Sequence, residues 1–336
     1  MIEIGERESV RRKPPSPIGL KHPLEVPELG LSSWFYPLGF PIELRTNSLE
    51  ILALADGLWS INEHRFDTRR IRVDVHVLDG DSTECPPTPQ VRIAAPLLIN
   101  VADSENYSIA NLEELTTQVF VSRGTLRHGA YMEYFLVGSA PLCHIASSHT
   151  TPVHGACVAC NGRGVLLCGD SGAGKSSLAY ACARAGWTYT SDDASFLLNK
   201  ADRRTVVGNC HQVRFRPSAI ELFPEVEGHV VTPRAAGKPS IEVPTVTMNG
   251  VNCSPTAEVD FLVFLNRKAS GLPRLSRFSR DAARQSLRQV LYGMPKTIAR
   301  QGAALERLLA IDVFELRYRD LDWAVNRLET LVREGC

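Results

Sequence analysis

The chain has 336 residues, of which 44% are hydrophobic and 22% are charged, and its 37 basic and 37 acidic side chains balance. This length suits one large domain or two ordinary ones, and the composition is that of a soluble globular protein. The neutral balance gives no support for nucleic acid or a membrane surface as partner, and no apolar run approaches the roughly 18–20 residues that cross a bilayer.

The first part of the chain predicts a flexible arm followed by a small domain. Residues 1–30 are rich in proline and charge and lack the apolar stretch of a secretory signal, which predicts a cytoplasmic protein. From Trp34 the run FYPLGFPIEL indicates short strands. Asn47 is a candidate N-cap with Glu50 as its capping-box partner, before an apolar helix over residues 49–59.

Further strands are predicted up to residue 147. Residues 71–78 alternate apolar and polar side chains, as in a half-buried strand, and residues 79–90 form a turn-rich loop. Strand-like runs follow at 91–101, 116–122 and 132–139. Residues 31–147 therefore predict an N-terminal α+β domain of unknown role that carries no chemical motif.

A boundary near residues 147–152 introduces an α/β domain over residues 148–336. Asn161-Gly162 predicts a hairpin that joins HGACVAC to the buried strand GVLLCG. Residues 175–185 indicate a helix and 187–191 a strand. The predicted elements beyond them are a strand pair at 195–199 and 205–209, an apolar strand at 257–266, and amphipathic helices at 279–294 and 320–333.

Residues 169–176 fit the phosphate-binding pattern G-x-x-x-x-G-K-[ST], between an apolar strand and a helix. The residues of this P-loop are Gly169, Asp170, Ser171, Gly172, Ala173, Gly174, Lys175 and Ser176. Glycines let backbone N–H groups surround phosphate oxygens, and the helix N-terminus adds a positive dipole. Lys175 is expected to reach the β- and γ-phosphates and Ser176 to offer its hydroxyl to Mg²⁺. The alternative is a Gly-rich turn with a surface lysine.

Asp192 and Asp193 follow the strand that comes after the P-loop helix. A right-handed crossover would place that strand beside the P-loop strand, with both aspartates near the γ-phosphate. There one carboxylate can bind Mg²⁺ and the other can accept a hydroxyl proton. The alternative is an acidic turn that caps the next element.

Two other features lie near the P-loop in the sequence. The hairpin folds His154 back along the P-loop strand, where it could orient a carboxylate or sense phosphate, although a structural histidine is the more common case. Cys157 and Cys160 form a C-x-x-C, but no second ligand pair for zinc is evident. Their side chains should also point to opposite faces of a strand. Reduced thiols are the simplest expectation for the nine cysteines.

The stretch from His154 to Asp193 resembles the catalytic domain of HPr kinase/phosphorylase. The order H-G, hairpin, G-V-L-L, G-D-S-G-A-G-K-S-S, A-R-A-G-W and S-D-D carries the resemblance, and VFELRYRDLDWAVNRLETLV resembles the closing strand and helix of such proteins. The resemblance implies a P-loop kinase fold related to phosphoenolpyruvate carboxykinase. It also implies ATP and Mg²⁺ as cofactors and a serine of a protein or peptide as the acceptor.

The resemblance also implies roles for residues of the site. Asp192 would be the base, and Asp193 would place the metal or pair with a positive side chain. His154 would lie near that pair, and Ser177 would complete the phosphate-binding stretch. The family assembles as hexamers, so a homo-oligomer is also implied. The family's Glu-x-Arg-Gly-x-Gly stretch has no counterpart here, so neither its metal ligand nor the phosphorolytic reverse reaction is carried over.

Two other functions stay open from the sequence. One is a small-molecule kinase on the same fold, and the other is a non-catalytic ATP-sensing protein whose N-terminal domain is the effector. Arg214, Arg216 and Lys238 are candidates for further phosphate contacts, although ordinary surface charge is the more common explanation for such residues. The identity of the acceptor cannot be read from the sequence.

Overall fold

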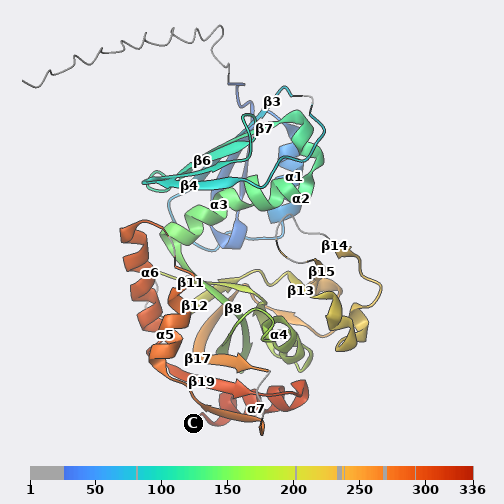
Figure 1. The fold of residues 1–336 in the computed structure, drawn as a ribbon, viewed down its shortest axis with the longest axis vertical. Helices are drawn as coiled ribbons and strands as arrows, with labels where there is room; N and C mark the ends of the chain where they lie inside the picture. The colour runs from blue at the N-terminus through green and yellow to red at the C-terminus, as the bar shows by residue number, and fades with distance from the viewer. Residues whose placement is uncertain are drawn as a thin grey trace, which may run out of the picture.

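The computed structural model describes residues 26–336 except 81, 201–202, 233–236, 238, 268–270, 292 and 336. Most of the predicted flexible arm, residues 1–25, therefore lies outside the described residues. Figure 1 shows two β-sheet regions stacked along the long axis, one from the N-terminal part of the chain and one from the C-terminal part. Among the described residues no helix is long and apolar enough to cross a membrane.

The N-terminal sheet has the order β1-β2-β3-β7-β6-β5-β4. Its strands are β1 (Leu31–Phe35), β2 (Ile42–Thr46), β3 (Ile71–Leu78), β4 (Gln90–Ala94), β5 (Leu97–Val101), β6 (Tyr107–Asn111) and β7 (Thr116–Ser122). β2, β3 and β7 are parallel, and the other neighbours are antiparallel. The predicted strands at 71–78 and 116–122 are confirmed, and the run at 91–101 divides into the hairpin β4–β5.

Helix α1 (Leu49–Trp59) has the predicted bounds, but its cap differs from the prediction. Ser48 is the N-cap, and its hydroxyl accepts the N–H of Glu50 at 3.2 Å. Asn47 instead bridges to β3, because its side chain exchanges two hydrogen bonds with the backbone of Val77. The capping box predicted from Asn47 is therefore wrong by one residue.

The predicted strand over residues 132–139 is wrong, because this segment is helical. α2 (Gly129–Tyr131), a π-helix (Met132–Leu136), α3 (Ser139–His144) and a second π-helix (Ile145–His149) follow one another. The buried residues Met132, Leu136, Val137 and Ala140 recur at helical spacing and pack on the N-terminal sheet. The short apolar run concealed this period.

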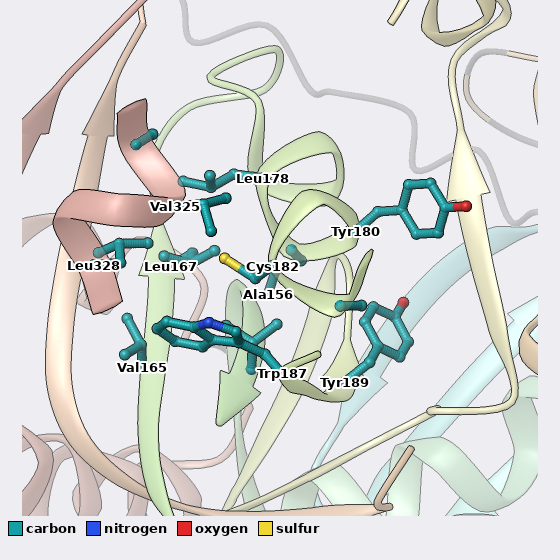
Figure 2. Packing of buried hydrophobic residues seen from close by; sticks show 14 of the residues in the cluster. Ala156, Val165, Leu167, Leu178, Tyr180, Cys182, Trp187, Tyr189, Val325 and Leu328 are labelled. Atoms are coloured by element: carbon teal, nitrogen blue, oxygen red, sulfur yellow. The ribbon is translucent and has the colours of Figure 1, made fainter. Parts of the chain in front are cut away.

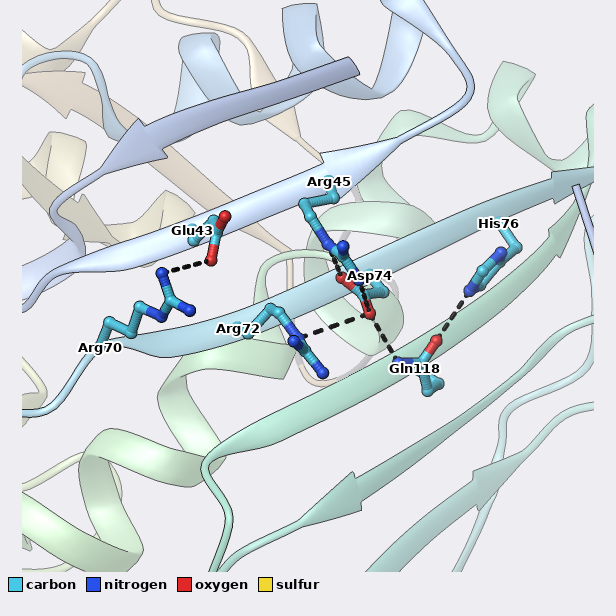
Figure 3. A network of polar contacts seen from close by, with 7 residues as sticks. All are labelled: Glu43, Arg45, Arg70, Arg72, Asp74, His76 and Gln118. Carbon is cyan, nitrogen blue, oxygen red and sulfur yellow. Dashed lines mark hydrogen bonds and ion pairs between the residues drawn. The ribbon is translucent and has the colours of Figure 1, made fainter. Parts of the chain in front are cut away.

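The opposite face of the N-terminal sheet carries a polar network (Figure 3). Asp74 on β3 accepts two hydrogen bonds from Arg45 and one from Gln118, each at 2.7 Å. Gln118 also pairs with His76 at 2.7 Å. The Asp74 side chain is only 3% exposed, so these bonds satisfy a carboxylate that burial alone would destabilise.

Replacing Asp74 with Ala is expected to lower the free energy of unfolding by about 1–3 kcal/mol, because Arg45 and Gln118 lose their acceptor. Burial raises the pKa of Asp74, but the bonds from Arg45 and Gln118 outweigh it and hold the pKa below its usual value. The stabilisation should therefore be present above about pH 4 and be lost as the pH falls further. Urea unfolding at pH 7 and at pH 3 measures this, with Asp79→Ala at a fully exposed carboxylate as control. An equal loss of unfolding free energy in Asp74→Ala and Asp79→Ala would contradict the stabilising role of the Asp74 network.

The described C-terminal strands form a larger sheet with the order β16-β10-β8-β11-β12-β17-β19-β18, in which β9 pairs with β17 and β8. Its strands are β8 (Thr150–Cys160), β9 (Arg163–Cys168), β10 (Thr188–Ser191), β11 (Ala194–Leu198), β12 (Thr205–Gly208), β16 (Asn252–Cys253), β17 (Thr256–Asn266), β18 (Arg274–Arg277) and β19 (Asp312–Arg317). A small sheet beside it contains β13 (Gln212–Phe215), β15 (Ser240–Pro244) and β14 (Val231–Thr232).

The hairpin β8–β9 is confirmed, with Asn161 and Gly162 both at positive φ in its turn. The predicted adjacency of the P-loop strand and the strand before the aspartates is wrong. β8 lies between β9 and β10 and is antiparallel to both, while β17 occupies the other edge of β9. β9 and β10 still run in the same direction, so their C-terminal ends lie at the same end of the sheet.

Helices cover both faces of the C-terminal sheet. These are α4 (Lys175–Arg184), α5 (Arg280–Arg288), α6 (Pro295–Leu308) and α7 (Leu321–Glu334). On one face, Leu178 and Cys182 of α4 pack in one cluster with Val325 and Leu328 of α7 and with Trp187 (Figure 2). The buried side chains of α5 and α6 pack with those of β8, β9 and β17 in a separate cluster. Short 3-10 helices occupy Pro37–Gly39, Arg123–Arg127, Pro217–Glu221, Pro224–Val226 and Thr245–Thr247.

The two sheet regions are packed against each other. The ring of Phe40 stacks on His149, with centroids 5.2 Å apart, and Gln301 of α6 donates to the carbonyl of Ala146 at 3.0 Å. Arg307 of α6 donates to the carbonyl of Leu198, which packs against the N-terminal core. The helical segment before β8 therefore lies between the sheets, as Figure 1 shows for α3.

Candidate nucleotide-binding site

The P-loop connects the C-terminal end of β9 to the N-terminus of α4, as predicted. Gly174, the residue before the helix, has φ 95°, and a Cβ there would lie 2.5 Å from the hydroxyl of Tyr318. That hydroxyl donates to the carbonyl of Ala173 at 3.2 Å, and this hydrogen bond ties the P-loop to the residue that follows β19. Glycine is therefore required at 174 by both backbone conformation and space.

Lys175 lies inside this loop and is only 5% exposed. Its ammonium group donates to the carbonyls of Gly169 and Asp170 at 2.9 and 3.2 Å, and to Nε2 of His154 at 3.0 Å. Burial lowers the pKa of Lys175, and nearby acidic groups, Asp193 first among them, oppose this shift. The loop therefore surrounds a positive charge that its own carbonyls hold in place.

The acidic pair lies at the break between β10 and β11, which both pair with β8. Ser191 is opposite Cys157 and Ala194 is opposite His154. Asp192 and Asp193 lie between these two paired residues in the chain, and therefore beside residues 154–157 of β8. The same part of β8 pairs with the end of the P-loop strand, where Gly155 is opposite Cys168. One long strand thus brings the acidic pair and the P-loop together.

Asp192 is buried and its side chain has a fixed partner. Its carboxylate accepts the backbone N–H of Arg214 on β13 at 2.7 Å, and its carbonyl accepts the hydroxyl of Ser176 at 3.3 Å. Burial raises the pKa of Asp192 to about 6, against the lowering effect of the Arg214 N–H. A carboxyl group with such a pKa can exchange a proton near neutral pH, which is the property of a general base.

His154 links Lys175 to Asp193. Its Nδ1 lies 3.4 Å from a carboxylate oxygen of Asp193, and its Nε2 faces the Lys175 ammonium group. An ammonium group has only donors, so Nε2 must accept and the proton of the neutral ring lies on Nδ1, directed at Asp193. The His154 ring therefore orients Asp193, whose side chain is 59% exposed.

Two cavities adjoin these residues, and a third adjoins the first of them. The loop pocket, of about 410 Å³, lies along the P-loop and is lined by Ser171, Gly172, Gly174, Lys175, Ser176 and Ser177. Arg214, Arg216 and Arg267 also line it, so its charge suits an anion. A side pocket of about 670 Å³ shares Leu222 and Arg267 with the loop pocket. The interface cleft, of about 390 Å³, lies between the two sheet regions and shares Tyr134, Asp193 and Arg214 with the loop pocket.

The structure brings most of the predicted site residues together in one region. The P-loop residues, His154 and the acidic pair are within the contacts described above, and Arg214 and Arg216 line the loop pocket. Lys238 lies outside the described residues. Cys157 and Cys160 do face opposite sides of β8, since they belong to different clusters. The described residues contain no group of three or more metal-binding side chains of the His, Cys, Asp and Glu types.

Sequence reasoning missed Arg267, Tyr318 and Tyr134. Arg267 and Tyr318 directly follow β17 and β19, which run parallel to β9 and end at the same edge of the sheet. Their positions after buried parallel strands were the available signal, because ligands bind at the carboxyl ends of such strands. Tyr134 comes from the helical segment that was predicted as a strand, and no local pattern pointed to it.

Comparisons with known proteins agree with the resemblance over part of the chain. Residues 146–221 match the family model of the HPr serine kinase C-terminal domain, a segment that contains His154, the P-loop and both aspartates. A solved structure described as the Hpr(Ser) kinase/phosphatase from Coxiella burnetii is similar at 14% identity and a TM-score of 0.29, over 55% of this chain and 99% of that chain. No curated protein matches the sequence. The resemblance to the HPr kinase C-terminal domain is thus confirmed for residues 146–221 of a mixed α/β protein.

Proposed function

We propose that this protein transfers the γ-phosphoryl group of ATP to a serine of a protein or peptide. The position of Asp192 and Asp193 carries the proposal: β8 holds them beside the P-loop, between the loop pocket and the interface cleft. A phosphoryl donor in the loop pocket and a hydroxyl in the cleft would meet at this pair. The HPr kinase match over residues 146–221 supports the same reaction.

The residues of the loop pocket fit the triphosphate of a nucleotide. The N-terminus of α4, the buried Lys175 and the three arginines that line the pocket all favour phosphate oxygens. The side pocket adjoins the loop pocket at Arg267 and leaves room for the nucleoside. ATP as the nucleotide is part of the proposal, because the P-loop recognises phosphates and not the base.

Ser176 and Asp193 fit a Mg²⁺ ion that is held mainly by phosphate oxygens and water. Magnesium typically takes only one or two protein carboxylates in such sites, and Asp193 is an exposed carboxylate on the wall of the loop pocket. The ion would neutralise charge on the phosphates. His154 would keep Asp193 oriented toward it through the Nδ1 proton.

In the proposed reaction Asp192 accepts the proton of the serine hydroxyl. The serine oxygen then bonds to the γ-phosphorus, the bond from that phosphorus to the bridging oxygen breaks, and ADP leaves. Lys175 stabilises the charge that develops on the phosphate oxygens. Positioning and electrostatics supply most of the acceleration in phosphoryl transfer, which agrees with a site built from a fixed strand and a preformed loop.

The test uses purified protein, γ-labelled ATP, Mg²⁺ and an extract of the cells in which the protein naturally occurs. Label on acid-stable phosphoserine in a polypeptide is the expected product. Label found only on small molecules would instead indicate a metabolite kinase. ATP binding without any transfer of label would contradict the kinase and favour an ATP-sensing protein.

The rate of transfer is expected to rise with pH through about 6 and to level off above it. The reason is that Asp192 must be ionised to accept a proton, and burial raises its pKa to about 6. The pH dependence of kcat/KM between pH 5 and 8 measures this. A flat profile across that range would argue against Asp192 as the base.

A further inference from the structure

The interface cleft is built from both sheet regions, and the N-terminal region contributes more than half of its wall. Leu58 and Trp59 come from the end of α1, and Ser139 and Leu142 come from α3. The opposite wall contains Asp192, Asp193 and Phe196. The N-terminal region, which carries no catalytic motif of its own, therefore shapes the space next to the acidic pair.

The charge of the cleft disfavours an anionic occupant. Among its described lining residues are three carboxylates, those of Glu133, Asp192 and Asp193, and one guanidinium, that of Arg214. Arg214 already pairs with Glu242, with 3.2 Å between Nε and the carboxylate oxygen. A phosphorylated or carboxylated metabolite would meet repulsion in this cleft, whereas a neutral or cationic segment would not.

Five large apolar side chains line the cleft. They are Leu38, Leu58, Trp59, Leu142 and Phe196. Leu142 is 38% exposed, and Leu38, Leu58 and Phe196 are partly exposed. Each would lose contact with water when an apolar group enters the cleft, so the cleft favours such a group beside the reacting hydroxyl.

We infer that the interface cleft binds the acceptor as an extended peptide segment with an uncharged, apolar residue next to its serine. The inference rests on the proposed function and adds the acceptor class and the role of the N-terminal region. The serine faces Asp192 and Asp193, and the apolar neighbour contacts Leu58 and Leu142. The cleft volume of about 390 Å³ lies at the small end of ligand sites, so it takes a short segment and not a folded surface.

The experiment measures phosphorylation of synthetic serine peptides grouped by the residues that flank the serine. Wild-type protein should phosphorylate pools with Leu or Phe flanks about tenfold or more faster than pools with Asp or Glu flanks. Leu142→Arg and Leu58→Arg each place a cation in the apolar wall and should reverse this preference. Leu49→Arg, at the other end of α1 and outside the cleft, should keep it.

The outcomes separate the inference from the proposed function. Activity without flank preference, or a preference that both cleft variants keep, overturns the inference and leaves the kinase standing. No phosphorylation of any peptide pool or cell protein by wild-type protein overturns the proposed function and the inference with it. The two cleft variants lie in different helices. Their melting temperatures test whether a change of preference comes from unfolding.

Discussion

Replacement of Asp192 by Asn is expected to reduce phosphoryl transfer by about 10²–10⁴-fold while ATP binding stays within a few-fold of wild type. The amide cannot accept the serine proton, but its oxygen can still accept the N–H of Arg214 that holds the side chain in place. Lys175 and the P-loop are unchanged, so the nucleotide keeps its contacts. Calorimetric titration with ATP and a transfer assay on the same preparations measure the two effects.

The same substitution is expected to make the protein more stable at high pH. Burial raises the folded-state pKa of Asp192 from 3.8 to about 6, so the ionised carboxylate destabilises the fold at pH values above that range. The cost is on the order of 2–3 kcal/mol at pH 8 and disappears below about pH 3, where the acid is neutral in both states. Thermal unfolding of both proteins at pH 8 and pH 3 measures it. Loss of activity together with loss of stability at pH 8 would mean that Asp192 is structural.

Replacement of Lys175 by Met is expected to weaken ATP binding by about 10–100-fold and to lower kcat/KM for transfer by at least as much. The ammonium group is the buried positive charge of the loop, and a charged hydrogen bond contributes about 1.5–3 kcal/mol. Methionine keeps the length and most of the volume of the side chain, so the loop should keep its shape.

A surface lysine provides the matched control. Lys296→Met changes an exposed side chain at the start of α6, away from the P-loop, and should leave binding and transfer unchanged. Near-normal ATP affinity in Lys175→Met, with its melting temperature preserved, would contradict the assignment of the loop as the triphosphate site.

The sequence predicted the local elements well wherever a hydrophobic pattern extended over a whole element or a turn had a characteristic sequence. Helix α1, strands β3 and β7 and the Asn161-Gly162 hairpin all have the predicted positions. The prediction failed at residues 132–139, a short and mostly apolar segment whose pattern fits a strand or a helix equally well. The cap of α1 was misplaced because Asn47 has a long-range partner in β3 that no local pattern reveals.

The residues of the site that belong to contiguous motifs were predicted from the sequence. The residues that reach the site from distant parts of the chain were not. The P-loop, His154 and the acidic pair come together as expected, but through β8, whose position between β9 and β10 depends on the pairing of the whole sheet. Arg267 and Tyr318 reach the loop from strands about a hundred residues or more along the chain. The interface cleft depends on the packing of the two sheet regions, which no local sequence pattern reveals.

The most direct test of the central claim follows the γ-phosphate of labelled ATP into phosphoserine, with wild type, Lys175→Met and Asp192→Asn in parallel. We predict labelled phosphoserine with wild type alone, together with ATP binding that persists in Asp192→Asn and weakens in Lys175→Met. Labelled phosphoserine from Asp192→Asn at the wild-type rate would contradict the claim that this acidic pair performs the chemistry.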